Sequence, residues 1–210
     1  MAKSRKRRAK TKLVSTDYLT EEQVRFVLEL LRARAAGGGF RAAVNLFLFE
    51  LLVMTGLRCC EAAGLELRDL PCCHGKDYID VRAAVAKNGR ARTVLIAPVF
   101  SRHIKQFVDR FREGCGGRIP LLINEAGNRI KYWNIYDRIK TIGRLTGIGW
   151  LHPHCLRHTY CTLLYGVGHD AFMVQEQAGH VKAETTKIYA HIGDNDRKRQ
   201  VLGLGRLLTP

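Results

Sequence analysis

The sequence predicts a mainly α-helical domain with one small antiparallel β-sheet, an α+β fold. Most of the chain has apolar residues at helical spacing, whereas only segments 78–82 and 92–96 are rich in strand-forming residues. An Asn-Gly pair, a strong hairpin signal, lies between those two segments. The 210 residues suit one domain, and a hydrophobic share of 46% is enough for a folded core.

The first half of the chain predicts three helices. Thr20 and Gln23 form the pattern of a capping box, after which one helical face is apolar, at Val24, Val27, Leu28 and Leu31. Three glycines at 37–39 should end this helix. Residues 41–55 are apolar nearly all round, which is typical of a helix at the centre of a domain, and Gly56 should close it. A short helix should begin near Arg58.

After the expected hairpin, helices resume at Pro98. One face of the first is marked by Ile104, Phe107, Val108 and Phe111, and a second helix carries Ile135, Ile139 and Ile142. From Pro153 to about Arg206 the chain should form several helices separated by glycines.

A large positive charge points to a polyanionic partner. Lys and Arg total 35 against 19 Asp and Glu, a net charge of +16, and nucleic acid is the simplest partner for such a surplus. Seven basic residues gather at the N-terminus: Lys3, Arg5, Lys6, Arg7, Arg8, Lys10 and Lys12. We expect this arm to follow DNA phosphates or enter a minor groove, the alternative being a solvated flexible tail. No strongly amphipathic basic helix supports a membrane surface as partner.

Cysteine usage favours a reducing compartment and no metal. The chain has 7 cysteines, an odd number, and its N-terminus lacks the apolar stretch of a signal peptide. Adjacent Cys59 and Cys60, and the Cys72-Cys73-His74 run, are the nearest approach to zinc ligands. Because no C-x-x-C pair occurs, we expect reduced thiols and no metal or other cofactor.

Four separated segments carry chemically active residue types: 55–61, 86–90, 154–159 and 179–191. His154 and Arg157 are three residues apart, which places them on one helix face. Guanidinium donors match phosphate oxygens, and two arginines can neutralise both non-bridging oxygens of a phosphodiester. A tyrosine hydroxyl, with an ordinary pKa of about 10, needs cationic neighbours and a base to become a nucleophile. The four segments therefore favour chemistry on a DNA phosphate.

At these residues the sequence resembles the tyrosine recombinases, the phage integrase family. Four motifs occur in that family's order: T-G-L-R-x-x-E, K-N-G-x-x-R-T-V, H-x-L-R-H-T and G-H-x-x-x-x-T-T-x-x-Y-x-H. The resemblance covers about Leu19 to Ile192. It implies the tyrosine recombinase catalytic-domain fold, with a basic arm at 1–18, the catalytic domain at 19–192 and a helical tail at 193–210.

The resemblance also implies a role for each candidate catalytic residue. Arg58 and Arg157 would clamp the scissile phosphate and stabilise the transition state. Lys87 would be the general acid for the departing 5′-oxygen, and His154 would help to activate the nucleophile.

His180 would hydrogen-bond the phosphate. Tyr189 would attack it, which gives a 3′-phosphotyrosyl link and a free 5′-hydroxyl. Because this link conserves the bond energy, strand joining would need no ATP. We expect no metal either, because no carboxylate cluster in the sequence stands ready to hold Mg²⁺.

Blander interpretations stay open at several positions. Arg58 could simply cap a helix or pair with Glu61, and Tyr160 or Tyr165 are more typical of core tyrosines. Arg90 and Arg92, near the hairpin tip, are expected to contact DNA, and either could take the place of the lysine there.

The resemblance implies a site-specific recombinase or integrase that acts on double-stranded DNA as a homotetramer, with accessory proteins and no membrane. We expect a cytoplasmic, nucleoid-associated protein. A type IB topoisomerase and a catalytically silent DNA-binding regulator are the alternatives. Relatives carry an additional N-terminal DNA-binding domain, so the chain is either a compact recombinase or an excised catalytic domain. Residues 201–207 could pack on their own domain or on a neighbouring protomer. Gln177-Ala178 replaces the usual leucine pair, so that helix should bury less apolar surface.

Overall fold

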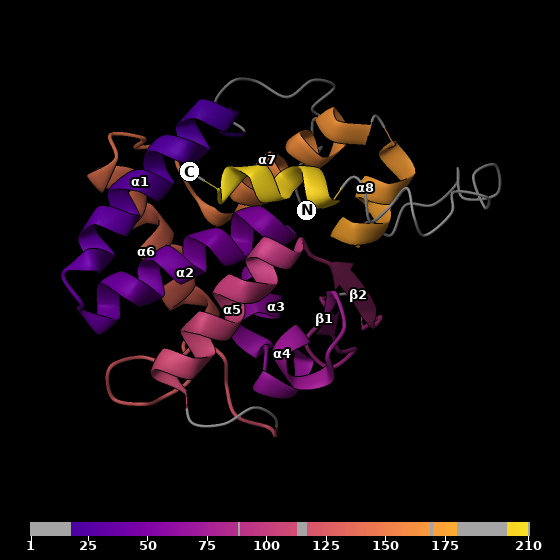
Figure 1. The fold of residues 1–210 in the computed structure, drawn as a ribbon, viewed down its shortest axis with the longest axis horizontal. Helices are drawn as coiled ribbons and strands as arrows, with labels where there is room; N and C mark the ends of the chain where they lie inside the picture. The colour runs from indigo at the N-terminus through magenta and orange to yellow at the C-terminus, as the bar shows by residue number, and fades with distance from the viewer. Residues whose placement is uncertain (1–17, 88, 113–116, 169, 180–200, 210) are drawn as a thin grey trace, which may run out of the picture.

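The computed structural model describes residues 18–87, 89–112, 117–168, 170–179 and 201–209, and it confirms the expected fold class (Figure 1). The elements in chain order are α1 (Glu21–Ala36), α2 (Phe40–Thr55), α3 (Cys59–Gly64), η1 (Leu67–Asp69), α4 (Pro71–His74), β1 (Tyr78–Val81), β2 (Arg92–Leu95), α5 (Pro98–Phe111), α6 (Tyr132–Leu145), α7 (Pro153–Gly168), α8 (Ala171–Ala178) and η2 (Gly205–Leu207).

Local sequence signals set the ends of the first two helices where they were expected. The hydroxyl of Thr20 accepts a hydrogen bond from the Gln23 N–H, while the Gln23 side chain accepts from the Thr20 N–H. Helix α1 ends at Ala36, before the three glycines, and Gly56 caps α2 in the left-handed region with φ of 61°.

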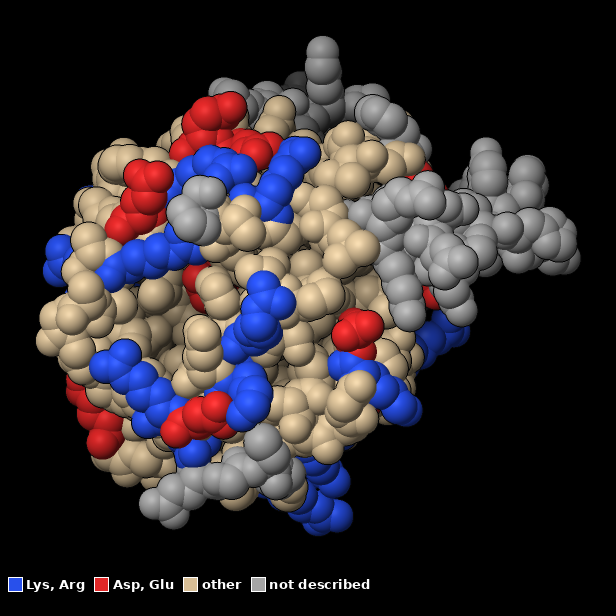
Figure 2. Space-filling model, viewed as in Figure 1, with Lys and Arg blue, Asp and Glu red and all other residues tan. Residues whose placement is uncertain are grey.

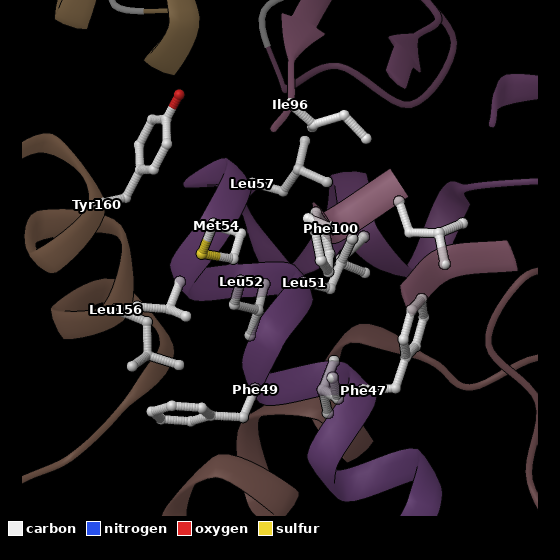
Figure 3. Close-up of a cluster of buried hydrophobic side chains, with 14 of the residues drawn as sticks. Phe47, Phe49, Leu51, Leu52, Met54, Leu57, Ile96, Phe100, Leu156 and Tyr160 are labelled. Atoms are coloured by element: carbon white, nitrogen blue, oxygen red, sulfur yellow. The ribbon is translucent and has the colours of Figure 1, made fainter. Parts of the chain in front are cut away.

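Helix α2 is the central element of the core. It packs against α1, α5, α6 and α7, which explains why its sequence is apolar nearly all round. Figure 3 shows Leu156 and Tyr160 of α7 on one side of α2 and Phe100 of α5 on the other. The one buried charge of α2, Glu50, lies 3.3 Å from His103 and 3.9 Å from Arg32. Within the described residues, no helix is both long and apolar enough to cross a bilayer.

The two strands pair antiparallel in the register Tyr78↔Leu95 to Val81↔Arg92, which confirms the predicted hairpin. Its connection, residues 82–91, is longer than the tight turn that an Asn-Gly pair usually forms. The turn itself closes at Gly89, which has φ of 66° and donates to the Ala86 carbonyl at 3.0 Å. Lys87 and Arg90 therefore lie on a loop, whereas Arg92 is in the ladder, opposite Val81.

A cluster of carboxylates and arginines joins the hairpin to the segment after α3. Arg82 binds Asp69 through Nε at 2.8 and 3.0 Å and lies 3.3 Å from Glu66. Arg129 donates to Glu66 at 3.2 Å. The short element η1, which local sequence signals did not predict, presents Asp69 to this cluster, and α4, equally unpredicted, follows it.

The C-terminal segment 201–209 packs on its own chain, against α1 and α5, so the structure shows the first of the two expected arrangements. Its buried residues are Val201, Leu204, Leu207 and Leu208. Arg206 pairs with Glu21 of α1 at 2.8 Å, and Arg32 donates to the Leu208 carbonyl at 3.1 Å. Leu202, expected on the same apolar face, is instead 53% exposed.

The junction between α2 and α3 generates a prediction about stability. A Cβ at Gly56 would overlap the ring of the fully buried Tyr160, and an alanine would also have to adopt the left-handed conformation. We expect Gly56→Ala to lower the free energy of unfolding by more than about 2 kcal/mol, measured by urea titration.

Gly75→Ala is the matched control, because Gly75 caps α4 with φ of 70° and has nothing within 4 Å of its Cβ position. It should show the backbone cost of about 1–2 kcal/mol alone. Equal losses in the two variants would contradict a steric role for Tyr160.

Candidate active site

Three segments far apart in the sequence meet at one end of α2. Arg58 is the N-cap of α3, Arg157 lies on α7, and Gly179 caps the C-terminus of α8. Arg58 Nη2 donates to the Gly179 carbonyl at 3.3 Å, across 121 positions of sequence. The predicted residues of the first and third motifs, and the beginning of the fourth, are thus brought together.

Arg58 is held at the start of α3 by a buried carboxylate. Its backbone N–H donates to Glu61 Oε2 at 2.9 Å, and its Nη1 donates to Oε1 at 3.0 Å. Glu61 is fully buried. The helix cap and the Glu61 pair considered in the sequence are therefore both real contacts, and they fix where the Arg58 guanidinium lies.

Arg157 is buried, with 3% of its surface exposed, and both ends of its guanidinium bind main chain. Nη1 donates to the Gly56 carbonyl at 2.6 Å, and Nη2 donates to the Ala178 carbonyl. Burial, and next the charge of Arg58, lower the pKa of Arg157 to about 10. It is still cationic at neutral pH, which a phosphate ligand requires.

Three arginines bind three successive carbonyls at the C-terminal end of α8. Arg92 Nε donates to the Gln177 carbonyl at 3.2 Å, while Arg157 and Arg58 bind those of Ala178 and Gly179. The last carbonyls of a helix lack partners within the helix and form the negative end of its dipole, so cations stabilise them. The arginines therefore fix the point from which the chain leads to His180.

Arg92, expected to contact DNA, is partly buried and bound to a carboxylate. Only 12% of its side chain is exposed, and its Nη1 and Nη2 each donate to one Glu61 oxygen at 2.9 Å. A guanidinium already occupied in this way is poorly available to DNA. The alternation of side chains along β2 could have indicated this burial, because Arg92 shares a face of the strand with the buried Val94.

Gln177 is a structural residue that the sequence analysis did not identify. Its side-chain Oε1 accepts from the Leu95 N–H of β2 at 2.8 Å, and its surface is 3% exposed. The expectation that α8 packs less apolar surface here is consistent with this hydrogen bond. A polar residue in place of a leucine was the available signal.

His154 lies near the start of α7, three residues before Arg157, as expected. Its ring meets that of His158 edge to face, with 4.5 Å between centroids. His154 is exposed at the surface, but partial burial of its ring, and next the charges of His158 and Arg157, lower its pKa below the usual value. His154 is therefore neutral at neutral pH, the form that can accept a proton.

The remaining candidates divide into exposed and undescribed residues. Lys87 and Arg90 lie exposed on the loop 82–91, and the contacts of Arg58 and Arg157 do not include Lys87. His180, Tyr189 and the seven basic residues of the arm lie outside the described residues.

Helix α7 carries two tyrosines, and neither has the surroundings expected of the nucleophile. Tyr160 is fully buried, and burial raises the pKa of its hydroxyl well above the usual value. Tyr165 is 46% exposed, toward the C-terminal end of the helix.

The charge at this site is unbalanced. Arg58 and Arg92 pair with one carboxylate, Glu61, while the nearby Arg157 binds main chain, and burial weakens solvent screening of the surplus positive charge. On the face viewed in Figure 2, by contrast, basic side chains are interspersed with acidic ones and form no single patch. The arrangement is suited to binding an anion and to stabilising the extra negative charge of a pentavalent phosphate.

Comparison with known proteins gives the site a context. The chain is 32% identical to the tyrosine recombinase XerD of Bifidobacterium longum over 84% of its own length and 58% of that protein. It is 32% identical to the tyrosine recombinase XerC of Roseiflexus sp., with 83% and 55% covered. The chain thus spans little more than half the length of these relatives.

Solved structures agree. A crystal structure of XerA recombinase matches 85% of this chain and 61% of that one, with a TM-score of 0.64 and 26% identity. The XerH site-specific recombinase bound to difH substrate, a pre-cleavage complex, matches 84% and 50%, with a TM-score of 0.62 and 26% identity. A family model described as the phage integrase family matches residues 17–196. This chain therefore belongs to the phage integrase family, the tyrosine recombinases.

Proposed function

We propose that this chain is the catalytic part of a site-specific DNA recombinase that cleaves and rejoins strands through a 3′-phosphotyrosyl intermediate. The observation that carries the proposal is the group of Arg58, Arg157 and neutral His154 at one end of α2. The two arginines supply fixed positive charge for the phosphate, and His154 can take a proton from a nucleophile.

The proposed reaction combines nucleophilic attack with two proton transfers, one away from the nucleophile and one to the leaving oxygen. The Tyr189 oxygen attacks phosphorus as its proton leaves to His154, and the bond to the 5′-oxygen breaks. Lys87, on the exposed loop 82–91, donates a proton to that oxygen, and His180 donates a hydrogen bond to the phosphate. A free 5′-hydroxyl from a second strand reverses these steps, so joining conserves the energy of the bond.

The proposed partner is double-stranded DNA, which the protein would bind as a homotetramer. The protein would act in the cytoplasm, associated with the nucleoid. XerH, one of the structural relatives, is a site-specific recombinase that was solved bound to difH substrate, which supports this partner. The basic residues at 3–12, together with Arg90, would add sequence-independent contacts to phosphates. Relaxation alone, as by a type IB topoisomerase, is less favoured, because the relatives XerD, XerC and XerA are recombinases.

Covalent capture tests the nucleophile. The wild-type chain, mixed in EDTA with a nicked duplex that carries the DNA flanking its gene, should give a protein–DNA adduct after a detergent quench. Tyr189→Phe should bind the duplex without forming the adduct, because it lacks the attacking oxygen. Tyr165→Phe, which removes the exposed hydroxyl of α7, is the control and should keep the adduct. An undiminished adduct in Tyr189→Phe would refute the assignment, and a strict Mg²⁺ requirement would refute the metal-free mechanism.

A second variant tests the phosphate clamp. Arg157→Ala should lower the single-turnover cleavage rate by about 10²–10³, the usual cost of removing one transition-state donor. Because Arg157 also binds main chain, circular dichroism must first establish that the variant is folded. Arg138→Ala is the control, since Arg138 is a half-buried arginine of α6 that binds the neutral Asn45. Equal rates for Arg157→Ala and wild type would exclude Arg157 from the reaction.

The lowered pKa of His154 predicts a pH dependence. A base must be deprotonated, so adduct formation should fall with decreasing pH only below about 6.5, the ordinary histidine value. The rate should be measured from pH 4.5 to 8 at saturating DNA. His154→Gln should be slower and lose this acid limb, whereas His74→Gln, which alters a histidine outside the site, should keep it. A midpoint above 6.5 would contradict a neutral His154.

A further inference from the structure

We propose that Arg92 is a positioning residue of the active site, because it holds Glu61, and through it Arg58, while it binds the end of α8. The inference rests on the proposed function, since it concerns the arginine that would clamp the phosphate. Arg92 itself would touch neither the phosphate nor the tyrosine. Its effect would be transmitted through two partners, one carboxylate and one helix terminus.

The first partner is Glu61, which Arg92 and Arg58 share. Arg92 uses both terminal nitrogens, at 2.9 Å each, while Arg58 reaches Glu61 Oε1 with one nitrogen at 3.0 Å. Burial alone would raise the pKa of Glu61, but the hydrogen bonds and charges of the two arginines outweigh burial and lower it. Arg92 thus satisfies most of the buried carboxylate, which leaves Arg58 Nη2 to point at α8.

Without Arg92, Glu61 would be a buried charge with a single arginine partner. An uncompensated buried carboxylate is costly, so the Arg58 guanidinium should turn toward it and form the two-pronged pair that Arg92 now makes. That movement would take Arg58 away from the place where it can meet a phosphate. The expected defect is therefore in the chemical step and not in folding alone.

The second partner is the C-terminus of α8. Besides the bond from Arg92 to the Gln177 carbonyl, the backbone at Gly179 passes directly over the Arg92 side chain. A Cβ at Gly179 would lie 3.0 Å from Arg92 Cδ, Nε and Cζ, and Gly179 has φ of 66°. A side chain at this position would have to displace the Arg92 side chain and would strain the backbone, so glycine suits this close approach. The next residue in the sequence is His180. Arg92 therefore helps to fix the position of the backbone at the C-terminal end of α8.

The same hairpin offers a matched control in Arg82. It is also an arginine bound to a carboxylate, with its Nε 2.8 and 3.0 Å from the two Asp69 oxygens, and its Nη2 donates to a helix-end carbonyl, that of Gly64, at 2.8 Å. It contacts none of Glu61, Arg58 or α8. Loss of Arg82 should destabilise the hairpin without disturbing the phosphate clamp.

The experiment compares Arg92→Gln, Arg92→Lys and Arg82→Gln with wild type. The first readout is the Arg58 side-chain Nε–Hε signal in ¹⁵N NMR, identified by its loss in Arg58→Lys, with and without inorganic phosphate. The second is the single-turnover cleavage rate at saturating nicked duplex, beside the Kd for that duplex. Thermal unfolding of each variant supplies the measure of stability.

In Arg92→Gln the Arg58 signal should shift and lose its response to phosphate, because the guanidinium has turned to Glu61. The cleavage rate should fall about a hundredfold, as for a misplacement of about 1 Å, while the Kd for DNA changes less than about twofold. Arg92→Lys, which keeps the charge but not the fork, should be intermediate. Arg82→Gln should lower Tm comparably yet keep the wild-type signal and rate.

The proposal is overturned if Arg92→Gln loses stability but keeps the Arg58 signal and the cleavage rate, or if Arg82→Gln has the same defect. Failure of the proposed function looks different. In that case the wild-type chain itself would form no adduct, and the Arg58 signal would still report whether Arg92 positions that guanidinium.

Discussion

The geometry of the site depends on the contacts of one buried carboxylate, that of Glu61. It satisfies the first turn of α3 through the Arg58 N–H, pairs with the Arg58 guanidinium, and binds Arg92 from the hairpin. A carboxylate without exposed surface is tolerable only with such partners. Three residues between Thr55 and Glu61 therefore act together: a glycine ends the central helix, an arginine is the next N-cap, and a glutamate holds the arginine.

The ends of two helices, α2 and α8, orient the guanidinium groups of the site. The end of α2 gives the Gly56 carbonyl to Arg157, and the end of α8 gives three carbonyls to three arginines. These groups would otherwise lack partners in a partly buried place. In the proposed reaction the guanidiniums are thus oriented before a phosphate arrives, which is how electrostatic stabilisation avoids the cost of reorganisation. The core around α2 serves this end by holding α3 and α7 at fixed positions.

Much of the fold could be predicted from local signals, and part of the site could not. Capping at Thr20, the termination at Gly56 and the paired strands follow from residue preferences that act over a few positions. The i, i+3 relation of His154 and Arg157 likewise follows from helix geometry. The contacts of Arg92 could not be predicted, because a charge near a turn is usually solvated and its partner Glu61 lies 31 positions away. No local pattern reports such a pairing, although the alternation of β2 placed Arg92 on the buried face.

The packing of residues 201–209 on α1 has a consequence for how the chain folds during synthesis. The pair between Glu21 and Arg206 joins positions 185 apart, and Leu207 and Leu208 fill space beside the first helix. Contacts of such long range form late, because the intervening chain must first be closed into a loop. While the ribosome is still adding residues, the apolar flank of α1 stays uncovered and is available to chaperones or to another nascent chain. Residues 201–209 therefore complete a surface that α1 begins, and these contacts can form only after that segment has been translated.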